Sequence, residues 1–499
     1  MYDLLNDENV YIEKRDVYSY PSGEHHFSPS EAYPEYRLGD LSPESNPVYD
    51  MVRAAFHGMG LDDERYGTPQ WNPLGDLIKS GDNVVIKPNL VMHVHRGNAA
   101  LGLDSVITHP SIVRAVTDYC LIALEGAGKL TIGDAPLQTC DWASLVDGHG
   151  YTALIAYYDS KGQSVNLIDF RLMHATRKAV AGINVLTNVE NSKGDDRGYA
   201  AVNIGKYSMH MEKISNYEKL RVTNYDPSKM KEHHNPNKNE YLIPRTILEA
   251  DVIINCPKPK THRKAGVTSA MKNLVGINGH KDWLPHHTKG SKAEHGDEYE
   301  HASWVKRMGT YAIEKADLAS LHNKAALSLF WGYVYRALLV LARKTVKDKF
   351  EEGSWYGNDT IWRTICDLNR ILLYADKEGI IKKEMQRKCL QVGDLIVSGD
   401  KDGPMAPRPK EVGVIATALN PAAFDTTICA LMGMDQKKIP SISGAYGIDQ
   451  YPIAAFSPAD VRMISNAEAY NGKAPSAISR ARSFGYEATS GWEGHIEAD

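Results

Sequence analysis

The chain has 499 residues, of which 42% are hydrophobic and 24% are charged, so it is neither disordered, collagen-like nor embedded in a membrane. At about 150 residues per domain, this length predicts two to four domains. The 57 basic and 62 acidic residues give a net charge of −5, which argues against nucleic-acid binding through bulk charge. We therefore expect no nucleic-acid partner.

The cysteine pattern indicates a reducing compartment. The six cysteines lie far apart and form no Cys-x-x-Cys pair, so the sequence offers no zinc ribbon, ferredoxin cluster or thioredoxin motif. The N-terminus has neither the basic region nor the apolar region of a secretory signal. We expect a cytoplasmic protein.

Composition divides the chain into five segments. Residues 1–75 are polar and Tyr-rich, and we expect them to wrap around a larger body. Residues 76–302 and 386–465 form an α/β core in two parts, separated by a helical insertion at 303–385. The tail, 466–499, is expected to be peripheral.

The strongest fold signal is a strand–helix–strand pattern. A β-branched run at 83–86 is followed by Lys-Pro-Asn, a helix is expected over 110–126, and a second strand covers 129–134. A third apolar run occupies 251–256. The predicted fold is α/β, with a mostly parallel sheet, flanking helices and an inserted helical segment.

Polar residues stand where each apolar run ends. In open α/β sheets, ligands bind beyond the carboxyl ends of the strands, so these residues should meet at one edge of the sheet. Several amines in one cleft favour an anionic substrate, although solvated surface lysines are the alternative explanation. The candidates for substrate binding are Lys87, Asn89, Lys258, Lys272 and Asn273.

We assign catalysis to His262, Lys260 and Asp134, with His262 as general acid or base because histidine titrates near neutrality. The stretch 267–276 predicts a short helix with a Thr/Ser-rich start. Its N-terminus either binds an anion or is a capped structural end.

Carboxylates at strand ends or helix starts can hold a hard cation such as Mg²⁺, or they can serve as helix caps. The metal candidates are Asp134, Asp394 and Asp425. The His-rich stretch 280–301 lacks the ligand spacing of a zinc or iron site, and we expect a polar flexible loop there.

Common nucleotide and hydrolase motifs are missing from the sequence. Residues 126–129, Gly-Ala-Gly-Lys, lack the upstream Gly and the Ser/Thr of a P-loop. No Gly-x-Gly-x-x-Gly follows a strand, and no Gly-x-Ser-x-Gly is present.

The segment 325–342 is largely apolar but is short for a membrane span and contains Arg336. We expect no transmembrane span. A helix buried in a hairpin or an interface is one interpretation. Membrane-surface contact through 324–349, which ends in a basic flank, is the other.

The motif order resembles a known family, the proteins grouped as domain-of-unknown-function family 362. The resemblance covers about 75–435 and rests on several motifs in sequence. They are Val-Ile-Lys-Pro-Asn at 85–89, Thr-His-Pro at 108–110, Ile-Gly-Asp at 132–134, Pro-Lys-Pro-Lys-Thr-His at 257–262, Met-Lys-Asn-Leu-Val-Gly at 271–276, Gly-Asp-Lys-Asp-Gly-Pro at 399–404, Asn420-Pro421, Phe424-Asp425 and Met432-Gly433.

The resemblance implies an α/β fold without an established reaction, and it adds His109 to the substrate-binding candidates. Residues 354–374 look like the longer members, which are associated with bacterial surface-polysaccharide genes. Some members carry a ferredoxin-like cluster domain, whose cysteines this chain lacks, so we expect no iron–sulfur cluster. The chain departs from the family's Val-Asp-Gly pattern at 392–394, where it has Val-Gly-Asp.

The leading hypothesis is an enzyme that acts on a phosphorylated or carboxylated small molecule, such as a sugar precursor of surface polysaccharide. Two alternatives are a scaffold protein of an envelope-assembly complex, docking through 303–349, and a redox enzyme fed by a separate electron carrier. The reaction, the cofactor and the oligomeric state stay open.

Overall fold

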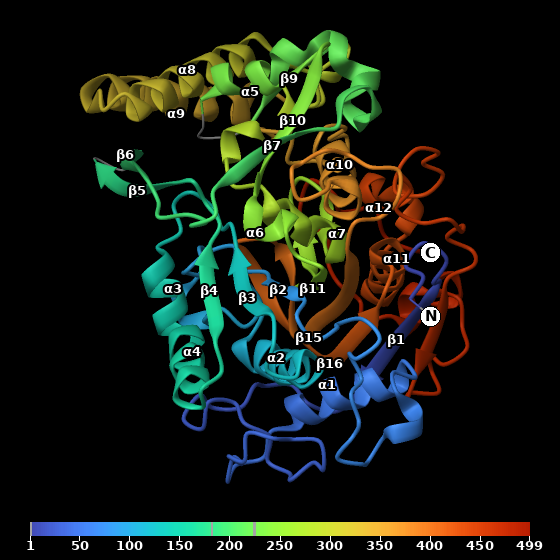
Figure 1. Cartoon of the computed structure of the whole chain (residues 1–499). Coiled ribbons are helices and arrows are strands. Elements are labelled where there is room, and N and C mark those ends of the chain that lie inside the picture. Colours follow the sequence, from blue (N-terminus) through green and yellow to red (C-terminus); the bar gives the residue numbers. More distant parts are fainter. Residues whose placement is uncertain (1, 181–182, 223–225) are drawn as a thin grey trace.

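The computed structural model describes residues 2–180, 183–222 and 226–499, and its centre is one large mixed sheet (Figure 1). The strand order along the sheet is β17-β1-β16-β15-β11-β2-β3-β4. These strands are β1 (Asn9–Lys14), β2 (Asn83–Pro88), β3 (Lys129–Asp134), β4 (Val165–Asp169), β11 (Val252–Cys256), β15 (Lys388–Asp402), β16 (Ala406–Ala418) and β17 (Arg462–Ser465). A short antiparallel pair, β12 (Lys260–His262) and β13 (Gly266–Thr268), joins the sheet through β15.

The middle of the sheet is parallel, as the sequence predicts. Strands β15, β11, β2, β3 and β4 all run in one direction, and Ile86 of β2 is in register with Ile254 and Ile132 on its two sides. At the other edge, β16 runs antiparallel to both β15 and β1. The α/β prediction is confirmed, and the three apolar runs lie side by side as β11, β2 and β3.

Helices cover both faces of the sheet, and this coverage explains the continuous apolar runs in the central strands. Val84 and Ile86 face one layer of helices, whereas Val85 faces the other. The first layer consists of α1 (Pro47–Gly58), α2 (Pro110–Leu124), α3 (Trp142–Gly148) and α4 (Tyr151–Ser160). The second consists of α6 (Arg245–Leu248), α7 (Ala270–Asn273), α10 (Ile361–Tyr374), α11 (Pro421–Met432) and α12 (Pro440–Ser443).

Smaller elements lie beyond the second layer. They are the strand pair β5 (Met173–Val180) and β6 (Ile183–Asn191), the small sheet of β7 (Tyr199–Asn203), β9 (His234–Asn235) and β10 (Lys238–Pro244), the pair β8 (Leu220–Arg221) and β14 (His287–Thr288), and helix α5 (Pro227–His233). The stretch 150–240 contains helices α4 and α5 as well as most of these strands.

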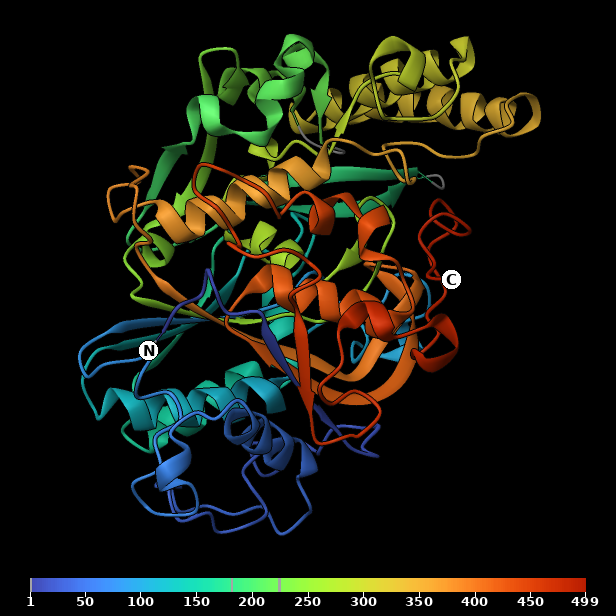
Figure 2. The ribbon, with the colours of Figure 1, turned by 90° about the vertical axis from the view of Figure 1, so that its right-hand side faces the viewer.

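The predicted helical insertion divides into two parts. Helix α10 packs on the sheet through residues such as Ile365 and Leu368 and belongs to the core. Helices α8 (Trp304–Leu321) and α9 (Ala325–Thr345) form a hairpin that projects from the body in both views (Figures 1 and 2). Among the described residues, α9 is the one helix long and apolar enough to cross a membrane.

The two ends of the chain take part in the core. Strand β1, from the N-terminal segment, lies within the sheet between β16 and β17. Trp492, from the predicted peripheral tail, is fully buried, and its Nε1 donates a hydrogen bond to the carbonyl of Arg263 at 2.8 Å. The Ala/Ser/Gly-rich composition of the tail obscures these isolated aromatic anchors. All six cysteines are buried and free.

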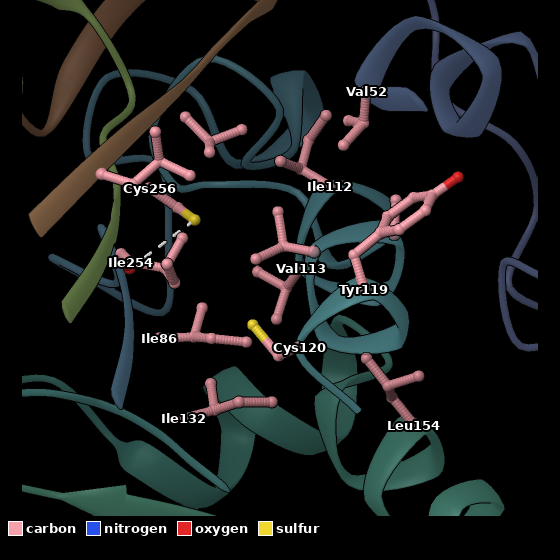
Figure 3. Packing of buried hydrophobic residues seen from close by; sticks show 14 of the residues in the cluster. Val52, Ile86, Ile112, Val113, Tyr119, Cys120, Ile132, Leu154, Ile254 and Cys256 are labelled. Carbon is pink, nitrogen blue, oxygen red and sulfur yellow. Dashed lines mark hydrogen bonds between the residues drawn. The ribbon is translucent and has the colours of Figure 1, made fainter. Parts of the chain in front are cut away.

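The core between the sheet and α2 supplies a stability prediction (Figure 3). Ile86, Ile132 and Ile254 lie opposite Val113 and Cys120 in this cluster. We expect Ile86→Ala to lower the free energy of unfolding by about 2–5 kcal/mol because it leaves a cavity in a packed layer. Urea denaturation measures the loss.

Ile380→Ala is the matched control, since Ile380 is 57% exposed. It should change the free energy by no more than about 0.5 kcal/mol. Equal losses in the two variants would contradict this description of the core.

Candidate functional site

A cavity of about 190 Å³ opens at the carboxyl ends of β2, β3 and β11. Asn89 follows β2, Asp134 ends β3, and Lys260 and His262 lie on β12, shortly after β11. Helix α7 and the segment after it contribute Lys272, Asn273 and Gly276. The edge of the sheet predicted from the sequence is therefore the place where the structure has a cavity.

Basic side chains outnumber acidic ones in the lining of this cavity. Among the described residues that line it, Asp134 is the one carboxylate. The cationic side chains in the lining are Arg96, Lys260, Arg263, Lys264, Lys272 and Lys281. Arg263 also pairs with Glu352, at 3.6 Å. An anion entering the cavity would meet an excess of positive charge.

The negative charge of Asp134 is already balanced. Its Oδ1 lies 2.7 Å from the Nζ of Lys87, and both side chains are buried. The carboxylate also accepts backbone N–H bonds from Leu90 and Ala135, at 2.7 and 2.9 Å. Burial lowers the pKa of Lys87, while the nearby Asp134 opposes that shift. The pair is thus a buried, hydrogen-bonded unit, of which Asp134 lines the cavity and Lys87, a predicted substrate-binding residue, does not.

Asn273 supports this unit. It accepts a hydrogen bond from Lys87 Nζ at 3.3 Å, and its amide nitrogen donates to Asn255 Oδ1 at 2.8 Å. Gly276 lies against the same pair, because a Cβ there would stand 2.0 Å from Asp134 Oδ1. Only glycine allows this close approach of the backbone to the ion pair.

Burial lowers the pKa of three lysines that line the cavity. Burial, and then the neighbouring Lys87, lower the pKa of Lys272 to about 8. Burial lowers the pKa of Lys264 to about 8 and that of Lys281 to about 7. The pKa of Lys260 falls well below its usual value through burial and then Lys258, and its Nζ donates to the carbonyl of Val106 at 2.6 Å. An amine with a pKa near the working pH can exchange protons with a ligand.

His262 is a neutral hydrogen-bond donor in this geometry. Its Nδ1 accepts backbone N–H bonds from Lys264 and Ala265, at 3.0 and 3.1 Å, so we assign the ring proton to Nε2. Burial, and then Lys272, hold its pKa well below the usual value. A ring with Nδ1 engaged and Nε2 protonated is poorly placed to accept a proton, which argues against the predicted acid–base role.

Two predicted substrate-binding residues lie in a different cluster. The Nζ of Lys258 pairs with Asp394 Oδ2 at 2.9 Å, and both side chains are fully buried. Tyr20, from the N-terminal segment, donates to Asp394 Oδ1 at 2.6 Å. His109 stacks on the Tyr20 ring, with centroids 3.9 Å apart, and its backbone N–H donates to Asp394. This cluster binds the N-terminal segment to the sheet, and neither Lys258 nor His109 lines the cavity.

The three predicted metal ligands do not come together. Asp134 pairs with Lys87, Asp394 pairs with Lys258, and Asp425 accepts the N–H groups of Ala270 and Met271 at the start of α7. Burial raises the pKa of Asp425 to about 7. Throughout the described ranges, no group of three or more His, Cys, Asp or Glu side chains is placed to hold a metal ion. Asp425 thus serves as a cap for the N-terminus of α7, which is the alternative to metal binding given above.

Sequence reasoning missed most of the cations in the cavity. Those that it did not select are Arg96, Arg263, Lys264 and Lys281. His286, which also lines the cavity, fell in a stretch expected to be a flexible loop, but its Nδ1 lies 2.7 Å from the carbonyl of Leu284. For Lys281 and His286, the sequence offered one signal, the density of His and Lys between 280 and 289. Such a density does not identify a particular kind of site.

The buried cluster around Asp394 supplies a second stability prediction. Lys258→Met would leave a buried carboxylate without its cation, so we expect a loss of about 3–5 kcal/mol in the free energy of unfolding. Lys382→Met, which breaks a surface pair with Asp376, should cost about 1 kcal/mol or less. Similar urea-denaturation midpoints for the two variants would show that the buried pair contributes no more to the free energy of unfolding than the surface pair.

The chain resembles known proteins at low identity. A thylakoid-associated protein of Synechocystis sp. is 22% identical over 203 residues. The match covers 41% of this chain and 41% of that protein. The crystal structure of a Thermotoga maritima protein matches with 9% identity and a TM-score of 0.27, over 78% of this chain and 55% of the other.

A family model gives a broader match, which spans most of the α/β core. It covers residues 84–190 and 175–430, a range that includes the cavity, the α8–α9 hairpin and most of β2 and α11. The match exceeds half of the chain and agrees with the motif order in the sequence. The chain belongs to the family described as domain of unknown function DUF362.

Proposed function

We propose that this protein is an enzyme that binds an anionic small molecule in the cationic cavity and acts on it by acid–base chemistry. The observation that carries the proposal is the charge of the lining, with six cationic side chains and one carboxylate that Lys87 already neutralises. A phosphorylated or carboxylated sugar precursor has the matching charge.

The lining residues have separate roles in this proposal. Lys264, Lys272 and Arg96 bind the anion, and Asn89 and Asn273 orient it from the ends of β2 and α7. The Nε2–H of His262 donates a hydrogen bond to a ligand oxygen. Lys281, with a pKa of about 7, is the group that exchanges a proton with the substrate.

We place the enzyme in the cytoplasm, because six buried free thiols suit a reducing environment. The relative named for its thylakoid association points to a membrane as an additional location. The match covers less than half of that relative's length, and we propose the membrane as a second location for this protein.

The first test is ligand stabilisation of the folded protein. Phosphorylated and carboxylated sugars, with their uncharged parent sugars as controls, should be ranked by the rise in thermal midpoint that each causes. A ligand at about 100 times its dissociation constant contributes about 2.7 kcal/mol. If no anion stabilises more than its parent sugar, the proposal fails. A stabilising ligand then serves as the substrate for turnover by wild type and by Lys281→Met.

Two variants test cations of the lining, namely the anion-binding Lys272 and the proton-exchanging Lys281. Lys272→Met and Lys281→Met remove one cavity cation each, and each should weaken anion binding roughly tenfold, the cost of a charge-assisted hydrogen bond. Isothermal titration calorimetry measures the change. Lys292→Met, at an exposed position outside the cavity, is the control and should bind like wild type. Wild-type affinity in both cavity variants would place the anion elsewhere.

The lysine pKa values also predict the pH dependence of binding. Sulfate is the probe, since its own charge is constant between about pH 6 and pH 9. Lys281, Lys264 and Lys272 carry protons at the lower pH and lose them as the pH rises through 7 and 8. An anion favours the protonated amines, so binding takes up protons and weakens by more than about tenfold over this range.

Calorimetry in buffers of different ionisation enthalpy counts the protons taken up with sulfate. Affinity independent of pH, with no proton uptake, would show that these lysines do not contact the anion.

A further inference from the structure

The exposed surface of the α8–α9 hairpin is the strongest feature that the cavity leaves unexplained. On α8, Trp304 is 63% exposed, and Met308 and Tyr311 follow it at helical spacing. On α9, Phe330 is 57% exposed and Val340 is 50% exposed. Large apolar side chains so exposed on a projecting element mark an interaction site.

Aromatic contacts connect the exposed side chains of the two helices. The rings of Tyr311 and Trp331 lie with their centroids 5.6 Å apart, and those of Trp331 and Phe330 are 5.3 Å apart. We call this surface the hairpin patch. It comprises Trp304, Met308, Tyr311, Leu327, Phe330, Trp331, Val340 and Leu341.

The opposite side of the hairpin is fixed to the body. Glu314 of α8 pairs with Arg221 at 2.6 Å and with Lys289 at 2.8 Å. Thr310 donates to Glu298 of the body, and within the hairpin Lys306 forms a buried pair with Asp348. Polar contacts thus tie α8 to the body, and the hairpin itself projects at the edge of the molecule (Figure 2).

The hairpin is also basic, in contrast to the rest of the chain. Residues 303–349 contain nine Lys and Arg but three Asp and Glu, whereas the whole chain has a net charge of −5. Two of the three acidic groups, Glu314 and Asp348, are engaged in the ion pairs above. The exposed cations at the end of α9 and beyond it are Arg343, Lys344, Lys347 and Lys349.

We propose that the α8–α9 hairpin docks the protein on a membrane surface rich in anionic phospholipid. The aromatic and aliphatic side chains of the hairpin patch enter the interfacial region, and the cations around it bind lipid phosphates. A helix that combines a Trp/Phe/Leu face with Lys and Arg is the type that lies in the membrane plane.

The contacts of the two helices with the rest of the protein favour a hairpin that lies on the membrane over one that crosses it. Helix α9 has the length and hydropathy of a span, but Ser328, Gly332 and Ala342, which share one face of it, are buried. Helix α8 carries Glu314, Lys315 and Asp317 near its middle and could not follow α9 into hydrocarbon without breaking the pairs of Glu314.

The test is co-sedimentation with vesicles of phosphatidylcholine alone or mixed with phosphatidylglycerol. Wild type should bind the mixed vesicles, bind phosphatidylcholine weakly, and be released by high salt. The double variant Phe330→Ser with Val340→Ser should bind the mixed vesicles more than about tenfold more weakly, because two apolar anchors are lost. Arg343→Glu with Lys344→Glu should lose the preference for phosphatidylglycerol.

Ile380→Ser is the matched control, since Ile380 is as exposed as Phe330 but lies outside the hairpin. It should bind like wild type. Lys272→Met should do so too, because the proposal is independent of the cavity. Circular dichroism and thermal midpoints confirm that each variant is folded.

Two results would overturn the proposal. One is wild-type vesicle binding by the Phe330/Val340 double variant. The other is a wild type that ignores vesicles and forms a dimer by light scattering, which the same double variant converts to monomer. In that case the patch joins two copies of the chain.

Discussion

The buried pair of Lys87 and Asp134 is the interaction on which the candidate site depends. Lys87 lies near the end of a strand that helices cover on both faces, so its ammonium group is buried away from water and needs a counter-charge. The neighbouring parallel strand supplies it with Asp134. The pair neutralises the one carboxylate among the described lining residues and thereby leaves the cavity with an excess of positive charge. A requirement of folding thus produces the electrostatics of the site.

The same pair constrains the chain around it. Gly276 must lack a side chain where it approaches Asp134, and its carbonyl accepts the N–H of Ala135 at 3.0 Å. Asn273 connects Lys87 to Asn255 on β11. Asp425 accepts the first N–H groups of α7 and so fixes the helix that carries Lys272 and Asn273. The carboxylate selected as a metal ligand therefore acts through the position of a helix.

How far the sequence predicts this arrangement depends on the range of each contact. The order of β2, α2 and β3 follows from local patterns, and the convergence of Asn89, Asp134 and Lys260 follows from the geometry of parallel strands. Lys258 stands two positions before Lys260 but pairs with Asp394 and Tyr20, a residue 238 positions away. The periodicity of hydrophobic residues, which predicts helices and strands, cannot predict a contact between residues so far apart in the sequence. Lys281 joins the cavity only because the segment after α7 folds over it.

Net charge gives a misleading account of this molecule, because its charge is distributed unevenly. The hairpin carries a net charge of +6, so the rest of the chain carries −11. An anionic bilayer would repel the body and attract the hairpin, and this difference would orient the protein before any apolar contact forms. Apolar contact alone fixes no such orientation, since it acts only at short range. In the proposed membrane-bound state, the basic residues of the hairpin would therefore determine which side reaches the lipid, and the apolar patch would determine how long the protein stays there.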